Sequence, residues 1–256
     1  MGVLDRTPLH WAAANGNMEV VEKLIEGGSD LEAKDKYGMR PALWAAWYGH
    51  LEILQLLINS GATSRCSNKQ GMGLLHCASQ NNNINVMNFI FESLENINVN
   101  EVDKCDRTSL HLAAENGHLE AVMRLIDMRC DCARRDKSGE TALHLAARNN
   151  HYEVIKKLLM LGVEINDRDV EGRTALHIAA QNGRPEAVEQ GNSALHLATL
   201  GNHTELTRLL VDAKCQIDLT NYLGKTPLQL ASRGSFIAIV DMIVKAERYY
   251  AVARVG

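Results

Sequence analysis

The sequence predicts an all-α solenoid of helix-turn-helix units joined by short β-hairpin fingers, and two observations support this expectation. A seven-residue segment of the form Thr/Ser-x-Leu-His-x-Ala-Ala recurs along the 256 residues, and most copies start 33 residues apart. A second stretch with apolar residues at helical spacing follows the segment. One such helix pair cannot bury its own apolar face, so the units are stable only when they stack on one another.

Eight starts of the segment are visible, spaced 33, 33, 35, 33, 33, 19 and 33 residues apart. They are Thr7, Arg40, Gly73, Thr108, Thr141, Thr174, Ser193 and Thr226. Threonine at this position can cap the free amides of a helix. Pro8, Pro41 and Pro227 fall at the first helical position, where a missing N–H costs nothing. Each start is therefore expected to begin the first helix of a repeat.

The position after each first helix is expected to need a left-handed backbone, which Gly adopts freely and Asn adopts better than other residues. The residues there are Gly16, Gly49, Asn82, Gly117, Asn150, Gly183 and Asn202. The second helix follows, for example over residues 19–25, 52–58 and 153–159. Further glycines then lead through a turn, here called the finger, to the next repeat.

This pattern resembles the ankyrin repeat, whose Thr-Pro-Leu-His-x-Ala-Ala signature returns about every 33 residues. The resemblance covers residues 1–250 and leaves a tail of residues 251–256 that fits no repeat. Residues 35–39, 44–47 and 240–250 are similar to the ankyrin repeat and death domain-containing proteins. In that family a death domain follows the repeats, and none is recognisable in these residues, so no function is expected from it.

Two places depart from the period. Between Thr174 and Ser193 the spacing is 14 residues short of 33, so one repeat is truncated near residues 186–192. Alternative splicing, an error in the gene model, or residues missing between Gln190 and Gly191 would each produce this gap. The third repeat is two residues longer than the others, and its finger has Asp106 where the others have Gly. We expect local irregularity at that finger.

Composition excludes several classes of function. Apolar residues make up 46% and charged residues 23%, as in an ordinary folded protein. The net charge of −4 offers no basic face, so a nucleic-acid partner is not expected. No apolar run approaches the roughly 20 residues that span a bilayer, and residues 1–6 lack the apolar core of a signal peptide. A monomer without membrane attachment is expected.

Six cysteines occur, and only Cys130 and Cys132 lie close together in the sequence. A Cys-x-Cys pair without a second ligand pair favours small half-buried thiols over a zinc site, so neither a metal nor another cofactor is expected. Reduced thiols are typical of a protein of the cytosol or nucleus.

Histidine recurs at one slot of the repeat. The six are His10, His76, His111, His144, His177 and His196. Recurrence argues for a structural hydrogen bond from each imidazole to the neighbouring turn, the use that ankyrin repeats make of this slot, rather than for chemistry. No phosphate-binding loop, nucleophile elbow or metalloprotease motif is present, so catalytic residues are not expected.

The second repeat carries the candidate binding surface. Trp11 and Trp44 occupy a slot that holds Leu or Ile in later repeats, and are expected in the core. Trp47 and Tyr48 occupy helix positions that are polar elsewhere, and in ankyrin proteins these positions and the fingers line the recognition surface. The predicted partner-binding residues are Lys34, Lys36, Tyr37, Met39, Trp47 and Tyr48. Surface aromatics flanked by Lys are typical of an interface hot spot. Alternatively, Trp47 covers a seam between repeats.

Two smaller expectations concern the later fingers. The charges of these fingers are mixed in sign and indicate a solvated face, at Asp103-Lys104, Asp136-Lys137 and Asp169.

Asn166 lies in a run that resembles the ankyrin sequences modified by a cytosolic asparaginyl hydroxylase. A purely structural Asn in the turn is the alternative. The sequence thus predicts a protein-binding module, an adaptor or scaffold in signalling. The alternative is a targeting or regulatory subunit that brings an enzyme to its substrate.

Overall fold

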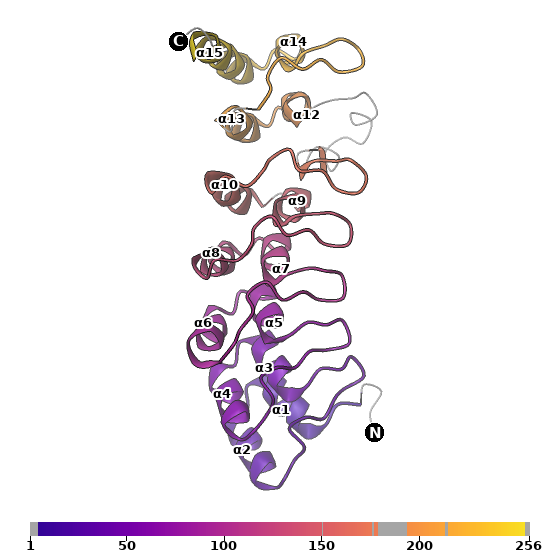
Figure 1. Cartoon of the computed structure of the whole chain (residues 1–256), viewed down its shortest axis with the longest axis vertical. Helices are drawn as coiled ribbons and strands as arrows, with labels where there is room; N and C mark the ends of the chain where they lie inside the picture. The colour runs from indigo at the N-terminus through magenta and orange to yellow at the C-terminus, as the bar shows by residue number, and fades with distance from the viewer. Residues whose placement is uncertain (1–4, 150, 176, 179–193, 213–214, 254–256) are drawn as a thin grey trace. The chain divides into compact units, whose positions relative to one another are not determined.

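The computed structural model describes residues 5–149, 151–175, 177–178, 194–212 and 215–253, which form two compact units, residues 1–142 and 143–256. In the first unit, first helices alternate with second helices along the chain (Figure 1). Its helices are α1 (Pro8–Asn15), α2 (Met18–Glu26), α3 (Pro41–Tyr48), α4 (Leu51–Asn59), α5 (Leu74–Gln80), α6 (Ile84–Ser93), α7 (Ser109–Glu115) and α8 (Leu119–Asp127).

Each first helix of the first unit packs on the next first helix, and each second helix packs on the next second helix. Alanine pairs make the close approach of the first helices possible, because their small side chains leave room for the neighbouring backbone. The pairs are Ala12 and Ala13, Ala45 and Ala46, and Ala113 and Ala114, all buried. The expected stack of helix pairs is therefore confirmed in this unit.

The second unit repeats this arrangement, with α12 packed on α14 and α13 on α15. Its described helices are α9 (Ala142–Arg148), which begins at the last residue of the first unit, α10 (Tyr152–Met160), α12 (Ala194–Leu200), α13 (Thr204–Asp212), α14 (Pro227–Arg233) and α15 (Ile237–Ala253). Apolar residues from four of these helices, among them Leu195, Leu210, Ala231 and Ile243, form one core. Helix α15 is 17 residues long and extends into the expected tail of residues 251–256. The truncated repeat near residues 186–192 lies outside the described residues.

The helix boundaries follow the local signals in the sequence. Pro8, Pro41 and Pro227 each stand at a first helical position, as expected. After first helices, the backbone is left-handed at Gly49, with φ 80°, and at Asn82, with φ 55°. These two residues show why the position alternates between Gly and Asn, which tolerate that conformation at low cost.

The fingers are hairpin turns without strands. Across the described part of the chain no strand is present, and a single isolated antiparallel bridge pairs Val102 with Thr108. The irregularity expected at Asp106 is absent: this residue has φ 60° and donates its N–H to Asp103 O at 3.0 Å, as Gly71 does to Asn68 O in the finger before. The expectation was wrong because Asp also tolerates the left-handed region.

The two additional residues of the third repeat are instead accommodated before the finger. Helix α6 has 10 residues, one more than α2, α4 and α8, and Asn96 after it has φ 55°. A pocket of about 560 Å³ opens beside this longer loop, lined among others by Ile90, Leu94 and Ile97. The insertion therefore changes the loop that follows a second helix and leaves the finger in register.

Candidate protein-binding surface

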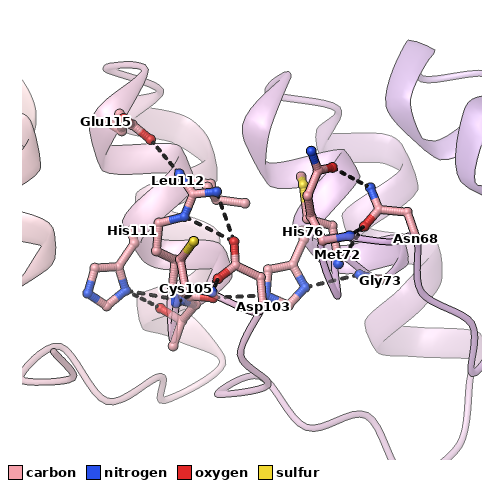
Figure 2. A network of polar contacts seen from close by, with 12 residues as sticks. Asn68, Met72, Gly73, His76, Asp103, Cys105, His111, Leu112 and Glu115 are labelled. Carbon is pink, nitrogen blue, oxygen red and sulfur yellow. Dashed lines mark hydrogen bonds and ion pairs between the residues drawn. The ribbon is translucent and has the colours of Figure 1, made fainter. Parts of the chain in front are cut away.

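Each described finger closes around one Asp or Asn side chain. Its Oδ1 atom accepts hydrogen bonds from the backbone N–H groups two and four residues further on, an Asx turn that fixes the loop. These residues are Asp35, Asn68, Asp103, Asp136, Asp169 and Asn221. In the third finger the distances to Asp103 are 2.7 Å from Cys105 N and 3.0 Å from Arg107 N (Figure 2).

These turns correct the expectation of a solvated, mixed-sign face. Asp103 is 3% exposed and Asp169 is also buried, while Asp136 is half-buried. The second oxygen of Asp103 is paired with the guanidinium of Arg107 at 2.9 Å. Burial alone would raise the pKa of Asp169, but hydrogen bonds from the backbone and guanidinium of Arg173 outweigh it and hold the pKa below its ordinary value. The carboxylates stabilise the turns and are withdrawn from the surface.

The recurrent histidines connect one repeat to the next, as expected. Nδ1 of His111 accepts the N–H of Thr108 at 3.1 Å, which leaves the proton on Nε2, and Nε2 lies 3.1 Å from Glu140 O in the next finger. The corresponding Nε2 contacts of His10, His76, His144 and His196 reach the carbonyls of Met39, Arg107, Arg173 and Lys225. Burial lowers the pKa of His111, which keeps the imidazole neutral. The structural interpretation of this slot is confirmed for these five histidines.

Four aromatic residues of the first two repeats form one group connected through Arg6, here called the aromatic cluster: Trp11, Trp44, Trp47 and Tyr48, with Arg6. Trp44 stacks on Tyr48 with ring centres 5.8 Å apart and meets Trp47 edge-on at 6.5 Å. The Arg6 guanidinium lies 4.1 Å from the ring centre of Trp44 and 4.8 Å from that of Trp11. The cluster is therefore a set of mutually fixed rings with a cation on one side.

The expected core position of the two tryptophans is wrong for Trp11, which is 47% exposed, and incomplete for Trp44, which is half-buried. Leu112 fills the same slot completely in the fourth repeat. An indole is too large for that slot, and the Trp44 ring extends outward, where its Nε1 donates to the Asp35 carboxylate at 3.1 Å. Arg6 pairs with the same carboxylate oxygen at 3.3 Å, a role that no sequence pattern had indicated.

Five of the six predicted partner-binding residues are accessible. Lys34, Lys36, Tyr37 and Tyr48 are exposed, with 53% exposure for Tyr48, and Trp47 is half-buried. Lys36 Nζ lies 5.4 Å from the Tyr37 ring centre, so the finger residues interact with each other.

Met39 does not belong to this surface, because it is only 3% exposed. Its backbone instead closes the finger: Met39 O accepts the N–H of Asp35 at 3.0 Å and the Nε2 contact of His10 at 2.9 Å. The apolar side chain packs inside, where it receives the Asn68 amide at 3.5 Å from sulfur. Met39 is therefore a buried residue that stabilises the finger and is not a candidate partner contact.

Asn166 lies on the second unit and is exposed, with its N–H donated to Glu164 Oε1 at 2.9 Å. Its side chain is thus at the surface of the loop that follows α10, separate from the buried Asp169 of the finger.

Two pockets are lined by residues that the structure describes. The pocket near α6 and a second of about 600 Å³ between α13 and α15 are lined by neither histidines nor buried carboxylates among the described residues. Within the same residues no group of three His, Cys, Asp or Glu side chains is placed to hold a metal ion. No described helix combines the length and apolar character needed to cross a membrane.

Three comparisons place this chain among known proteins. A family model described as ankyrin repeats in three copies matches residues 2–69, 75–169, 136–190 and 189–252. The last two matched segments meet at residues 189–190, where the sequence period shortens. A tankyrase poly(ADP-ribose) polymerase from Caenorhabditis elegans is 46% identical over 52 residues, 19% of this chain and 2% of that protein. The palmitoyltransferase ZDHHC13 of Mus musculus is 44% identical over 45 residues, 16% of this chain and 7% of that protein.

This chain therefore spans only a small part of the length of these two curated relatives. Among solved structures, the ankyrin repeat domain of Bcl-3, described as a unique member of the IkappaB protein family, matches with a TM-score of 0.67 and 25% sequence identity. That match covers 93% of this chain and 98% of the Bcl-3 chain. Since the family model matches nearly the whole sequence, this chain belongs to the ankyrin-repeat family.

Proposed function

We propose that this chain is a signalling adaptor or scaffold that binds a protein partner through the fingers and first helices of its first unit. The observation that carries the proposal is the aromatic cluster, in which Tyr48 is exposed yet held by the Trp44 ring. Trp44 is in turn fixed by Asp35 and Arg6. A ring that is already ordered loses little conformational freedom on binding, which favours its use as an anchor.

The contacts proposed are Lys34, Lys36, Tyr37, Trp47 and Tyr48. Aromatic anchors beside cations are the residue types that dominate interface energetics, and truncating one typically weakens binding by about 2 kcal/mol or more. All six cysteines are free thiols, which supports residence in the cytosol or nucleus, where thiols stay reduced. The chain acts in this proposal as a monomer without a cofactor, and it binds a protein rather than a nucleic acid or a membrane.

Capture from cell extract tests the proposal. The bait is the full chain, and Tyr48→Ala is the sharpest variant because Tyr48 is exposed and its removal leaves Trp44 bonded to Asp35. A double Trp47→Ala, Tyr48→Ala variant follows, with helicity checked by circular dichroism. Val20→Ala with Met123→Ala is the matched control, because these exposed apolar residues lie on the second helices α2 and α8.

Partners that disappear with Tyr48→Ala and remain with the control support the aromatic cluster as the binding site. An unchanged set of partners with both folded variants contradicts it, and the search would move to the later fingers.

A second candidate is a targeting subunit that brings an enzyme to its substrate. Two relatives favour it: the tankyrase and the palmitoyltransferase are named as enzymes, yet this chain matches only short repeat segments of them. The matched segments make up 2% of the tankyrase and 7% of the palmitoyltransferase. The two candidates are distinguished by assaying the captured complex: an enzyme whose activity toward its substrate rises with the wild-type chain, and not with Tyr48→Ala, supports the targeting function.

A further inference from the structure

Four consecutive fingers of the first unit carry a lysine directly after the buried or half-buried Asp or Asn. The four are Lys36, Lys69, Lys104 and Lys137, and all are exposed. We call this set the lysine row. The corresponding residues of two fingers in the second unit are Val170 and Tyr222, so the row is confined to the first unit.

Backbone hydrogen bonds hold the lysine row in register. The N–H of Lys69 donates to Tyr37 O at 2.9 Å, that of Lys104 to Gln70 O at 2.7 Å, and that of Lys137 to Cys105 O at 2.9 Å. Each of these three lysines is therefore bonded to the finger before it, and within this unit the fingers lie side by side (Figure 1). The four side chains thus leave equivalent points of adjacent, mutually bonded turns.

The ammonium groups of the row have no carboxylate partner within the described residues. The neighbouring Asp35 is bonded to Arg6, Trp44 and backbone amides, Asp103 is paired with Arg107, and the second finger has the neutral Asn68. Lys36 contacts only the Tyr37 ring. The acidic residue that closes each charged finger of the row is thus buried or half-buried, while the lysine after it is exposed.

We propose that the lysine row binds an acidic peptide segment of the partner protein, laid along the fingers; this inference rests on the proposed function. Ammonium groups are compact, strongly hydrated charges that attract carboxylates and raise the rate of encounter. The third finger also exposes Asp106 and, before it, Glu101. A peptide can place neutral residues opposite these two carboxylates, whereas a nucleic-acid backbone carries a phosphate at every step. The geometry therefore favours the peptide.

Fluorescence anisotropy with the full chain tests this proposal. The probe is a labelled peptide of alternating Glu and Ser, and its control has Gln in place of Glu. The key variant changes all four lysines of the row to Gln. The matched control changes four other lysines to Gln with the same loss of charge: Lys23, Lys156, Lys225 and Lys245.

We expect each single substitution in the row to weaken binding of the acidic peptide about two- to five-fold, the range of exposed ion pairs. The four substitutions together reduce binding to the level of the Gln peptide, while the control variant stays within about two-fold of wild type. Equal losses in the two quadruple variants would overturn the proposal, as would equal binding of the Glu and Gln peptides. Tighter binding of a single-stranded oligonucleotide through the same lysines would assign the row to nucleic acid instead.

The experiments distinguish failure of the lysine-row inference from failure of the proposed function. If Tyr48→Ala loses the captured partner while the lysine-row variant retains it, the aromatic cluster remains the binding site and the acidic-segment inference is wrong. If the lysine-row variant loses the acidic peptide while Tyr48→Ala retains every captured partner, the row binds acidic peptides and the aromatic cluster is not the anchor.

Discussion

The indole N–H of Trp44 donates to the carboxylate of Asp35 at 3.1 Å, which ties the first helix of the second repeat to the finger that precedes it. The same carboxylate accepts the N–H groups of Tyr37 and Met39, both at 2.9 Å, and pairs with Arg6 at 3.3 Å. One buried side chain thus determines the turn, the orientation of the indole and the position of the cation above it. The finger and the aromatic cluster are therefore joined through the contacts of Asp35.

Substitutions of Asp35 distinguish the hydrogen bonds that form the turn from the contacts with Trp44 and Arg6. Asp35→Ala leaves four donors without their acceptor, and we expect it to lower the free energy of unfolding by about 2 to 3 kcal/mol. Asp35→Asn keeps the acceptor oxygen, as Asn68 and Asn221 do in their fingers, and should cost only about 0.5 to 1 kcal/mol. Urea unfolding followed by circular dichroism measures both. Equal losses for Ala and Asn would show that the contacts of the second carboxylate oxygen with Trp44 and Arg6, not the turn, are what matters.

The third finger offers a stabilising substitution. Asp106 has φ 60°, a conformation that Gly adopts at no steric cost and that Gly38 and Gly71 adopt in the fingers before it. Asp106→Gly should therefore stabilise the chain by about 0.5 to 1 kcal/mol. Asp106→Ala is the control: it removes the same carboxylate but retains the backbone strain, so it should not stabilise. Thermal unfolding measures the stability of both variants. An equal increase in stability for Gly and Ala would show that loss of the carboxylate charge, not relief of backbone strain, is the cause.

The third finger also shows how much of the fold could be predicted from the sequence. A 33-residue period located the helices, because apolar spacing, Pro and Gly are local signals, and recurrence identified the structural histidines such as His111. In the fingers, too, Asp or Asn recurs at one position of the repeat. That recurrence was the available signal that Asp103 and Asp169 are buried turn residues rather than a solvated face.

The aromatic cluster was less predictable. Trp47 and Tyr48 stood out because their positions are polar in other repeats, but the exposure of Trp11 and the burial of Met39 depend on side-chain volume in three dimensions. No sequence pattern predicted the position of Arg6, because its contacts with Asp35, Trp11 and Trp44 join residues up to 38 positions apart in the sequence. Such relationships appear only when the repeats are stacked.

Thiol reactivity should divide the cysteines into two groups. Burial raises the pKa of Cys66 to about 11 and that of Cys215 to about 12, and it also raises the pKa of Cys77. The neighbouring Cys130 side chain lowers the pKa of Cys132 below its ordinary value, and Cys105 is exposed. Brief iodoacetamide treatment of the native chain near neutral pH should therefore modify Cys105 and Cys132 first. Peptide mass spectrometry reads this out, with the urea-unfolded chain as the control; early labelling of Cys77 would contradict the packing.

We propose Asn166 as a site for a cytosolic asparaginyl hydroxylase, the alternative being a purely structural Asn in the turn. Its side chain is exposed on the loop after α10, so an enzyme can reach it without unfolding the buried finger turn. Incubation with that hydroxylase should add the mass of one oxygen atom to the Asn166 peptide, and Asn166→Ala should abolish the addition. Modification of the buried Asn221 instead, or of neither residue, would leave Asn166 with a structural function in its loop.

The buried histidines make stability depend on pH in one direction. Burial lowers the pKa of His10, His76, His111, His177 and His196 below the ordinary value of 6.5. Below pH 6.5 the unfolded chain binds protons that the native chain does not, so the stability present at higher pH is lost as the pH falls through 6.5 toward the native pKa values. The urea midpoint should therefore decrease between about pH 7 and pH 5.

The variant His111→Gln isolates this effect. Gln229 occupies the same slot in the last repeat and accepts the N–H of Thr226 at 3.1 Å, so Gln can replace the imidazole at the start of the helix. We expect His111→Gln to cost about 1 to 2 kcal/mol at neutral pH, through the weakened contact with Glu140, and to lose less additional stability than wild type on acidification. The exposed His203→Gln serves as the control. If the midpoints of wild type and His111→Gln fall in parallel, then protonation of His111 is not coupled to unfolding, and the acid sensitivity arises at other groups.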